Sequence, residues 1–223
     1  MSIEERKTRE KVERRSLILG KAKALILERG VASFTMQDIA AACELSKATI
    51  YLYFQNKDAI LMEILEEAAS AFVEYAKSRI PEGASGLRAL HALWESYLIL
   101  FGESQDIVVL TGIKNFIDPE FPLNPDSQGS RFGQAMGKLL DLISDVLRQG
   151  MADGSLETGP DPDRLARTVI MISTSIIDTV TRIPRPRRDS LRISTEMRET
   201  FGILLRGLAA EGSDPSLFTL TEK

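Results

Sequence analysis

Residues 47–54 carry side chains that could read duplex DNA. Ile50 and Phe54 lie four residues apart, so in a helix they share one face that can pack against the protein. The opposite face carries the small or polar side chains of Lys47, Ala48, Thr49 and Tyr51. Such side chains fit a major groove about 12 Å wide, where Lys47 and Thr49 would set base preference. Lys57 follows within reach of a phosphate, although a solvated surface lysine is the alternative.

Residues that could carry enzymatic chemistry are scarce. The chain has one histidine and one cysteine, and it contains no G-x-S-x-G, G-x-G-x-x-G or phosphate-binding loop motif. His91 and Glu95 lie one helical turn apart and could form half a metal site, but a surface hydrogen bond is the commoner role of such a pair. Cys43 ends the apolar stretch IAAAC and is expected to pack as an inert thiol. We expect no enzyme activity, no catalytic residue, no metal and no cofactor.

The charge of the chain is unevenly distributed. The 223 residues include 28 Lys+Arg and 32 Asp+Glu, which gives a net charge of −4. Residues 1–60 hold 11 Lys+Arg and 8 Asp+Glu, a net of +3, which leaves 17 minus 24, or −7, for the remainder. The basic front end is therefore the part of the chain suited to a nucleic-acid partner.

The sequence predicts a cytoplasmic protein without a membrane segment. A single cysteine excludes an internal disulfide and fits a reducing compartment. Residues 1–15 alternate in charge and lack the apolar region of a secretory signal. The best candidate for a membrane span, residues 168–177, has ten uncharged residues, whereas a span requires roughly 20.

Helical periodicity dominates the sequence, and no run of alternating apolar and polar residues predicts a strand. We therefore expect an all-α fold. Thr35 and Ser46 can cap two short helices that only Glu44 and Leu45 separate. Proline-rich links at 118–126 and 182–188 interrupt the later part of the chain. The expected helices span about residues 5–29, 36–43, 47–54, 56–79, 87–101, 105–117, 131–151, 162–181 and 188–210.

Two short helices joined by a tight turn and preceded by a basic helix are typical of a helix-turn-helix reader. The sequence from about residue 14 to 65 resembles the TetR family of bacterial transcriptional regulators. The resemblance is carried by residues 18–30, ILGKAKALILERG, and by the spaced signature Thr35-x-x-x-Ile39-Ala40, Leu45-Ser46, Ile50-Tyr51-x-Tyr53-Phe54 and Lys57. It implies an N-terminal helix-turn-helix three-helix domain at residues 1–58. The C-terminal helical bundle, residues 59–223, would bind a ligand and form a dimer.

The resemblance also implies roles for individual residues. The recognition-helix contacts with DNA fall on Lys47, Ala48, Thr49 and Tyr51. Contacts with the DNA backbone fall on Tyr53 and Lys57. Thr35 and Ser46 would lie near phosphates at helix N-termini. The chain departs from the family at the turn, where Cys43-Glu44-Leu45 replaces a small residue, glycine and valine. Either Glu44 adopts a positive φ with some strain, or the turn differs slightly.

The highly charged start of the chain has two interpretations. Six basic and four acidic residues alternate between residues 4 and 15. A solvated helical extension is favoured, and an arm that enters a DNA groove is the alternative.

Aromatic and methionine residues of the later part could line a ligand pocket. They are Trp94, Tyr97, Phe101, Phe116 and Met136. Each alone is more typical of a core residue, but in a TetR-like protein this region encloses a small-molecule pocket that is mostly apolar. No charged residue stands out among them, so we expect an apolar or aromatic effector. The segment 118–126 would be a lid over this pocket or a surface loop.

The last two helices are expected to form a dimer interface. Their apolar stripes are Leu165, Val169, Ile172, Ile176 and Val180 on one, and Met197, Phe201, Leu204, Leu205 and Leu208 on the other. Packing within the chain's own core is the alternative.

The sequence as a whole predicts a homodimeric transcriptional regulator, a repressor that a small molecule releases from a roughly palindromic operator in double-stranded DNA. The alternatives are a DNA-binding regulator without a small-molecule effector and a small cytosolic helical enzyme.

Overall fold

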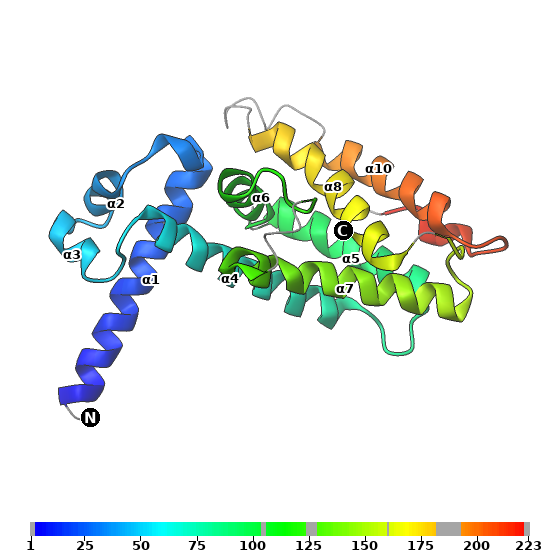
Figure 1. The fold of residues 1–223 in the computed structure, drawn as a ribbon, viewed down its shortest axis with the longest axis horizontal. Helices are drawn as coiled ribbons and strands as arrows, with labels where there is room; N and C mark the ends of the chain where they lie inside the picture. Colours follow the sequence, from blue (N-terminus) through cyan, green and yellow to red (C-terminus); the bar gives the residue numbers. More distant parts are fainter. Residues whose placement is uncertain (1–2, 104–105, 124–128, 160, 182–192, 221–223) are drawn as a thin grey trace.

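A computed structural model describes residues 3–103, 106–123, 129–159, 161–181 and 193–220. Within these residues the chain is α-helical and contains no β-strand, apart from one isolated bridge between Leu156 and Ala209. The predicted all-α fold is confirmed. Figure 1 shows a small group of helices, α1 to α3, at one end of the molecule and a larger bundle at the other, joined by α4.

The small group is formed by α1 (Ile3–Arg29), the 3-10 turn η1 (Val31–Ser33), α2 (Met36–Ala42) and α3 (Lys47–Tyr51). The second half of α1 supplies a buried apolar face, against which α2 packs, and α3 packs in turn against α2. The side chains that form this core are those of Ile18, Ala22, Ile26, Ile39, Ala40, Ile50 and Phe54. Helical spacing brings these residues to one side of each helix, as the sequence predicts.

Helix α4 (Lys57–Arg79) belongs to both parts of the molecule. Asn56 caps its first turn by accepting the Ala59 N–H at 2.8 Å. The helix packs against α1 in the small group and against α5, α6 and α7 in the bundle. Its side chains Ile60, Leu61, Ile64 and Leu65 are fully buried. A movement of the bundle against α4 would therefore reach the small group.

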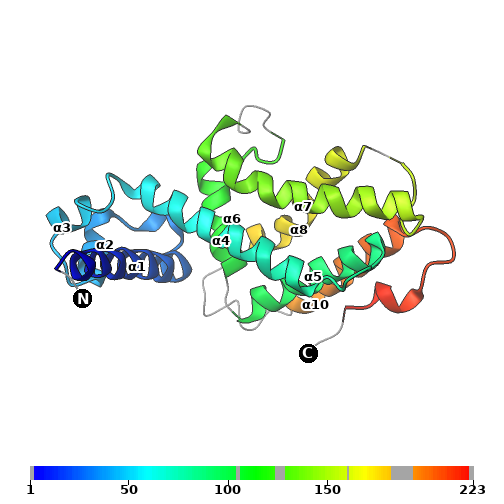
Figure 2. The same cartoon turned by 90° about the horizontal axis from the view of Figure 1, so that it is seen from below.

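The bundle consists of α5 (Gly86–Glu103), α6 (Asp106–Ile117), α7 (Arg131–Asp153), α8 (Pro162–Thr181) and α10 (Ile193–Leu208). Figure 2 shows the same helices from a second side. Helices α5 and α7 approach each other at Gly86 and Gly150, where a Cβ on Gly86 would collide with the Gly150 backbone. No helix among the described residues is long and apolar enough to cross a membrane.

Helix α3 is shorter than the sequence predicts. It ends at Tyr51 instead of Phe54, because the chain turns at Leu52 and begins α4 after Asn56. The Phe54 N–H donates to the Ile50 carbonyl at 3.0 Å, which keeps the Phe54 ring in the core. The start predicted for the last helix, residues 188–192, and the link 182–188 lie outside the described residues.

The predicted apolar stripes of the last two helices need a correction. Val169, Met197, Phe201 and Leu205 are buried within the chain, because the bundle packs α8 and α10 against α5, α6 and α7. Phe201 stacks on Trp94 with the ring centres 5.2 Å apart. The apolar side chains that remain outward are Met171 and Ile203, beside the half-buried Leu165, Ile172, Ile176, Leu204 and Leu208. The side chain of Val180 is not among those described.

Candidate nucleic-acid interface and ligand cavity

The turn between α2 and α3 is closed by two backbone hydrogen bonds. The Leu45 N–H donates to the Ala40 carbonyl at 2.9 Å, and the Glu44 N–H donates to the Ala41 carbonyl at 3.1 Å. This pattern of hydrogen bonds requires the residue before Leu45 to adopt the left-handed backbone conformation. Glu44 takes that position with a φ of 57°. Of the two expectations for this turn, the structure has the one in which Glu44 adopts the positive φ.

Helix α3 directs its apolar side inward and its polar side outward. Ile50 and Phe54 lie in the core, whereas Lys47 and Ala48 are exposed and Tyr51 is 45% exposed. The Lys47 ammonium lies 5.9 Å from the centre of the Tyr51 ring. Thr49 and Tyr53 are half-buried. The structure thus brings together on one surface three of the four side chains expected to make recognition-helix contacts with DNA.

Leu52 is a feature of this surface that the sequence interpretation did not assign. Its side chain is 81% exposed directly after α3. The helical pattern offers little signal for it, because an apolar residue between Tyr51 and Tyr53 looks like part of a buried run.

The hydroxyls of Thr35 and Ser46 serve as helix caps. Thr35 accepts the Asp38 N–H at 3.3 Å and donates to the Asp38 carboxylate at 2.6 Å. The same carboxylate accepts the Thr35 N–H, and these bonds to Thr35 hold the pKa of Asp38 below its usual value. Ser46 accepts the Thr49 N–H at 3.0 Å. Both residues are exposed at helix N-termini, and their predicted place near phosphates stays a prediction.

Lys57 is turned toward the protein. Its ammonium donates to the carbonyls of Val31 at 2.5 Å and Phe34 at 2.8 Å, and it lies 4.1 Å from the centre of the Phe34 ring. Burial lowers the pKa of Lys57. The ammonium also lies 5.3 Å from the ring centre of Phe116, on α6. In this structure Lys57 therefore connects α4 to η1 and α6, and its contact with a phosphate stays a prediction.

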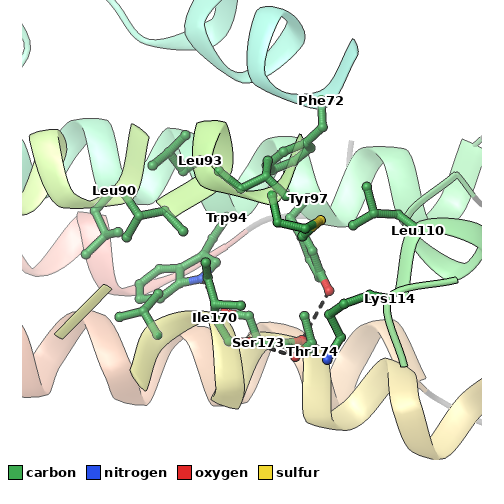
Figure 3. A pocket seen from close by; sticks show the side chains of 14 residues that line it. Phe72, Leu90, Leu93, Trp94, Tyr97, Leu110, Lys114, Ile170, Ser173 and Thr174 are labelled. Atoms are coloured by element: carbon green, nitrogen blue, oxygen red, sulfur yellow. Dashed lines mark hydrogen bonds between the residues drawn. The ribbon is translucent and has the colours of Figure 1, made fainter. Parts of the chain in front are cut away.

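A cavity lies in the middle of the bundle (Figure 3). Its volume is about 60 Å³, and its lining comes from α4, α5, α6, α7 and α8. Of the predicted pocket residues, Trp94, Tyr97 and Met136 line it. Phe101 is half-buried outside the lining, and Phe116 is exposed near Lys57. Periodicity alone could not separate these two from the others, because the faces of α5 and α6 that meet the cavity depend on how the bundle packs.

Polar side chains gather at one end of the cavity, although its accessible wall is apolar. The Tyr97 hydroxyl donates to the Ser173 carbonyl at 3.2 Å, and Trp94 Nε1 donates to the Ser173 hydroxyl at 3.2 Å. Lys114, only 5% exposed, extends to the same end and donates to the Phe121 carbonyl at 3.4 Å. Burial lowers the pKa of Lys114, although Asp178 and Asp118 oppose this shift, and burial raises the pKa of Tyr97.

Lys114 was missed by the sequence analysis, which expected no charge in the cavity. Its position in the apolar run of α6 was the signal that could have indicated this burial, because Lys114 lies four residues after Leu110, which also lines the cavity. The structure also bears on several other residues that the sequence analysis singled out. Cys43 is buried and unpaired, His91 lies 3.8 Å from Glu95, and no group of three His, Cys, Asp or Glu in the described part of the chain could hold a metal. Phe121 and Pro122, from the predicted lid or loop, are buried, and residues 124–126 lie outside the described residues.

Comparisons with known proteins identify the small group of helices. Residues 18–74 match the family model of bacterial regulatory proteins, tetR family. The fatty acid metabolism regulator protein of Bacillus subtilis (strain 168) is 26% identical over 74% of this chain and 80% of its own length.

Solved structures share the fold over most of the chain. A regulator FadR from Bacillus subtilis, in complex with stearoyl-CoA, has a TM-score of 0.64 at 21% identity over 86% of this chain and 98% of its own. The ketosteroid transcriptional regulator KstR2 of Mycobacterium tuberculosis has a TM-score of 0.63 at 21% identity, over 89% and 96%. The matched residues contain α2, the Glu44 turn and α3, so this N-terminal part of the chain belongs to the TetR family of bacterial regulatory proteins.

Proposed function

We propose that this regulator binds a roughly palindromic DNA operator as a homodimer and releases it when an apolar acyl compound enters the bundle. The observation that carries the proposal is the placement of α3, whose inner side is fixed in the core while Lys47, Ala48 and Tyr51 face solvent. A DNA-reading helix needs this arrangement. We further propose a division into a DNA-binding domain at residues 1–58 and a ligand-binding and dimerisation domain at 59–223. The protein would act in the cytoplasm as a repressor without enzyme activity.

Helices α8 and α10 supply the dimer surface of this proposal. They lie side by side along one edge of the bundle (Figure 1). Ile203 is 65% exposed and Met171 is also exposed, and half-buried apolar side chains surround them. A two-fold mate would cover this apolar area in a four-helix interface. The same symmetry would place two α3 helices in major grooves about 34 to 36 Å apart, or a multiple of one turn.

The cavity indicates the chemistry of the effector. Its accessible walls are apolar, and the side chains of Lys114 and Tyr97 lie close to Ser173 at one end. An acyl chain would fit the walls, and its carboxylate or thioester carbonyl would accept a hydrogen bond from Lys114. The similar B. subtilis regulator solved with stearoyl-CoA supports an acyl-CoA as the compound to test first.

The size of the cavity indicates how binding would be transmitted. A volume of about 60 Å³ is far below the roughly 300 to 1,000 Å³ of ordinary ligand pockets. An effector would therefore have to separate the helices that line the cavity. One of these is α4, through Phe72, and another is α6, which carries both Lys114 in the cavity and Phe116 at Lys57. Either displacement would shift α3 relative to its mate and weaken binding to one half-site.

The test begins with DNA that the purified protein selects from a random pool. Lys47→Ala and Tyr51→Ala should each weaken binding to the selected duplex about fivefold or more, because a contact of this kind is worth about 1 to 3 kcal/mol. Lys77→Ala is the matched control, since it removes an exposed charge at the far end of α4. Gel-shift affinities of both α3 variants equal to that of the parent would reject the proposed interface.

Release by an effector is measured on the same complex. Stearoyl-CoA or a shorter acyl-CoA should dissociate it at micromolar concentrations. If no acyl-CoA or free fatty acid does so while DNA binding is intact, the alternative of a regulator without a small-molecule effector is favoured.

A further inference from the structure

The first half of α1 projects beyond the core of the small group. All side chains from Glu4 to Arg14 are exposed, and the helix continues without a break into the buried half that begins near Ile18. Figures 1 and 2 both show the N-terminal end of α1 at the same end of the molecule as α3. This extension does not contribute to the core, so its sequence is free to serve another partner.

Arg15 fixes the direction of the extension relative to α3. Its guanidinium donates to both oxygens of the Glu63 carboxylate, with the Nε contact at 2.6 Å. It also donates to the Tyr53 carbonyl at 3.1 Å and lies 4.3 Å above the centre of the Phe54 ring. These contacts tie α1 to the segment between α3 and α4. The extension therefore keeps a defined position beside the DNA-reading surface.

The charges of the extension are sorted by face. Arg6 pairs with Glu10 at 3.1 Å, and Arg9 pairs with Glu13 at 3.6 Å, each one helical turn away. Lys7, Lys11 and Arg14 have the spacing of a second face and form no ion pair within the described residues. Glu10 and Glu13 are thus paired with arginines, whereas the other two acidic residues, Glu4 and Glu5, lie at the start of the helix.

The three cations lie beside the end of the recognition helix. Lys7, Lys11 and Arg14 line an open groove of about 270 Å³ together with Leu52 and Tyr53, which directly follow α3. Glu10 also lines this groove and is the acid already held by Arg6. A positively charged groove continuous with a DNA-reading helix suits a phosphate backbone, because phosphates next to the half-site must pass there when α3 enters the major groove.

We propose that Lys7, Lys11 and Arg14 bind the phosphodiester backbone that flanks the half-site, and that the helical extension lengthens the DNA footprint of each subunit. This inference rests on the DNA binding proposed above. Lys7 and Arg14 are seven residues apart, or about 10 Å along a helix, which matches about three base pairs at 3.4 Å each. The contacts add affinity without adding base preference, since phosphates carry no sequence information.

The experiment compares two double variants that remove the same charge. Lys7→Gln with Lys11→Gln alters the proposed backbone contacts, and Lys77→Gln with Arg79→Gln removes two exposed charges at the far end of α4. Binding to a 40-base-pair duplex of random sequence is measured by fluorescence anisotropy between 50 and 200 mM KCl. The slope of log K against log salt is negative, and each lost phosphate contact should reduce its magnitude by about 0.9. The first variant should therefore lose about 1.8 per subunit, and the control should keep the parent's slope.

Two outcomes overturn the inference. An unchanged slope for Lys7→Gln with Lys11→Gln would exclude the backbone contacts, and an equal loss in the control would show a general charge effect instead. Thermal unfolding followed by circular dichroism checks that both variants keep the fold, which is expected because all four side chains are exposed. A parent protein that binds no duplex at 50 mM KCl would reject the proposed function itself, and this inference with it.

Discussion

Glu44 holds the geometry of the helix-turn-helix at some cost in backbone energy. Its φ of 57° is a conformation that a side chain with a Cβ adopts with strain, typically of about 1 to 3 kcal/mol. The two hydrogen bonds that close α2 depend on this conformation, and they set the angle between α2 and α3. The position thus shows how a local conformation at one residue orients a functional surface.

Replacing Glu44 by glycine should stabilise the protein. Glycine adopts the left-handed region without a Cβ clash, and its larger entropy loss on folding offsets part of the gain. We expect Glu44→Gly to raise the free energy of unfolding by about 1 kcal/mol, measured by urea denaturation. Glu44→Ala is the control, because it removes the charge and keeps the Cβ. An equal gain in both variants would assign the effect to the carboxylate.

Lys114 gives a second prediction at the same scale. Burial lowers the pKa of Lys114 in the folded state below its usual value of 10.5. Between the two pKa values the unfolded chain binds more protons than the folded protein, so stability rises with pH there, and the charged Lys114 opposes folding at neutral pH. Lys114→Met should therefore keep or raise stability while it removes the polar anchor. We expect the stearoyl-CoA concentration for half-release of DNA to rise about tenfold or more, with DNA affinity unchanged. Lys77→Met is the control, and an unchanged release curve would contradict the role of Lys114.

The orientation of the side chains in the DNA interface could be predicted from the sequence better than the burial of those at the cavity. The orientation of Lys47, Ala48 and Tyr51 follows from local helical spacing around Ile50, so one short helix is sufficient to predict it. The burial of Lys114 depends on how α5, α7 and α8 meet α6, and no local pattern records that packing.

At the scale of the elements, helix starts were predictable where a capping side chain is present. Thr35, Ser46, Asn56 and Ser130 each accept a backbone N–H in the first turn of the helix that follows. The end of α3 was predicted too late. Tyr53 and Phe54 extend the apolar pattern, and the turn at Leu52 is imposed by the packing of Phe54 into the core and by the start of α4.

The contact between α5 and α7 allows a sharp test of element packing. Gly86→Ala would place a Cβ against the Gly150 backbone, which cannot move as a flexible side chain can. We expect a loss of several kcal/mol in the free energy of unfolding, or no folded protein. Gly137→Ala is the matched control, since it lies within α7 with nothing within 4 Å of the added Cβ. This variant should be neutral or stabilising by up to about 1 kcal/mol. Equal stability of both variants would contradict the close approach.

At the scale of the whole molecule, the structure explains why four residues of the predicted dimer stripes, Val169, Met197, Phe201 and Leu205, are core. Helices of the bundle are apolar on more than one side, and a periodic pattern does not distinguish a face that meets the chain's own helices from one that meets a second copy. Phe201 and Met197 belong to the first kind, and the exposed side chain of Ile203 belongs to the second in the proposed dimer. The apolar area that remains outward is small, so the proposed interface depends on few side chains.

Ile203 is therefore the position at which the dimer should be most sensitive. Ile203→Glu would place a charge in the centre of the proposed interface, where it would lose its hydration without gaining a partner. We expect the protein to sediment as a monomer at micromolar concentration and to bind a two-half-site duplex with at least tenfold lower affinity. Leu123→Glu is the matched control, because Leu123 is 66% exposed against 65% for Ile203 and lies outside α8 and α10. A variant that remains dimeric would move the interface away from α10, whereas a monomer that retains full operator affinity would separate DNA binding from two-fold symmetry.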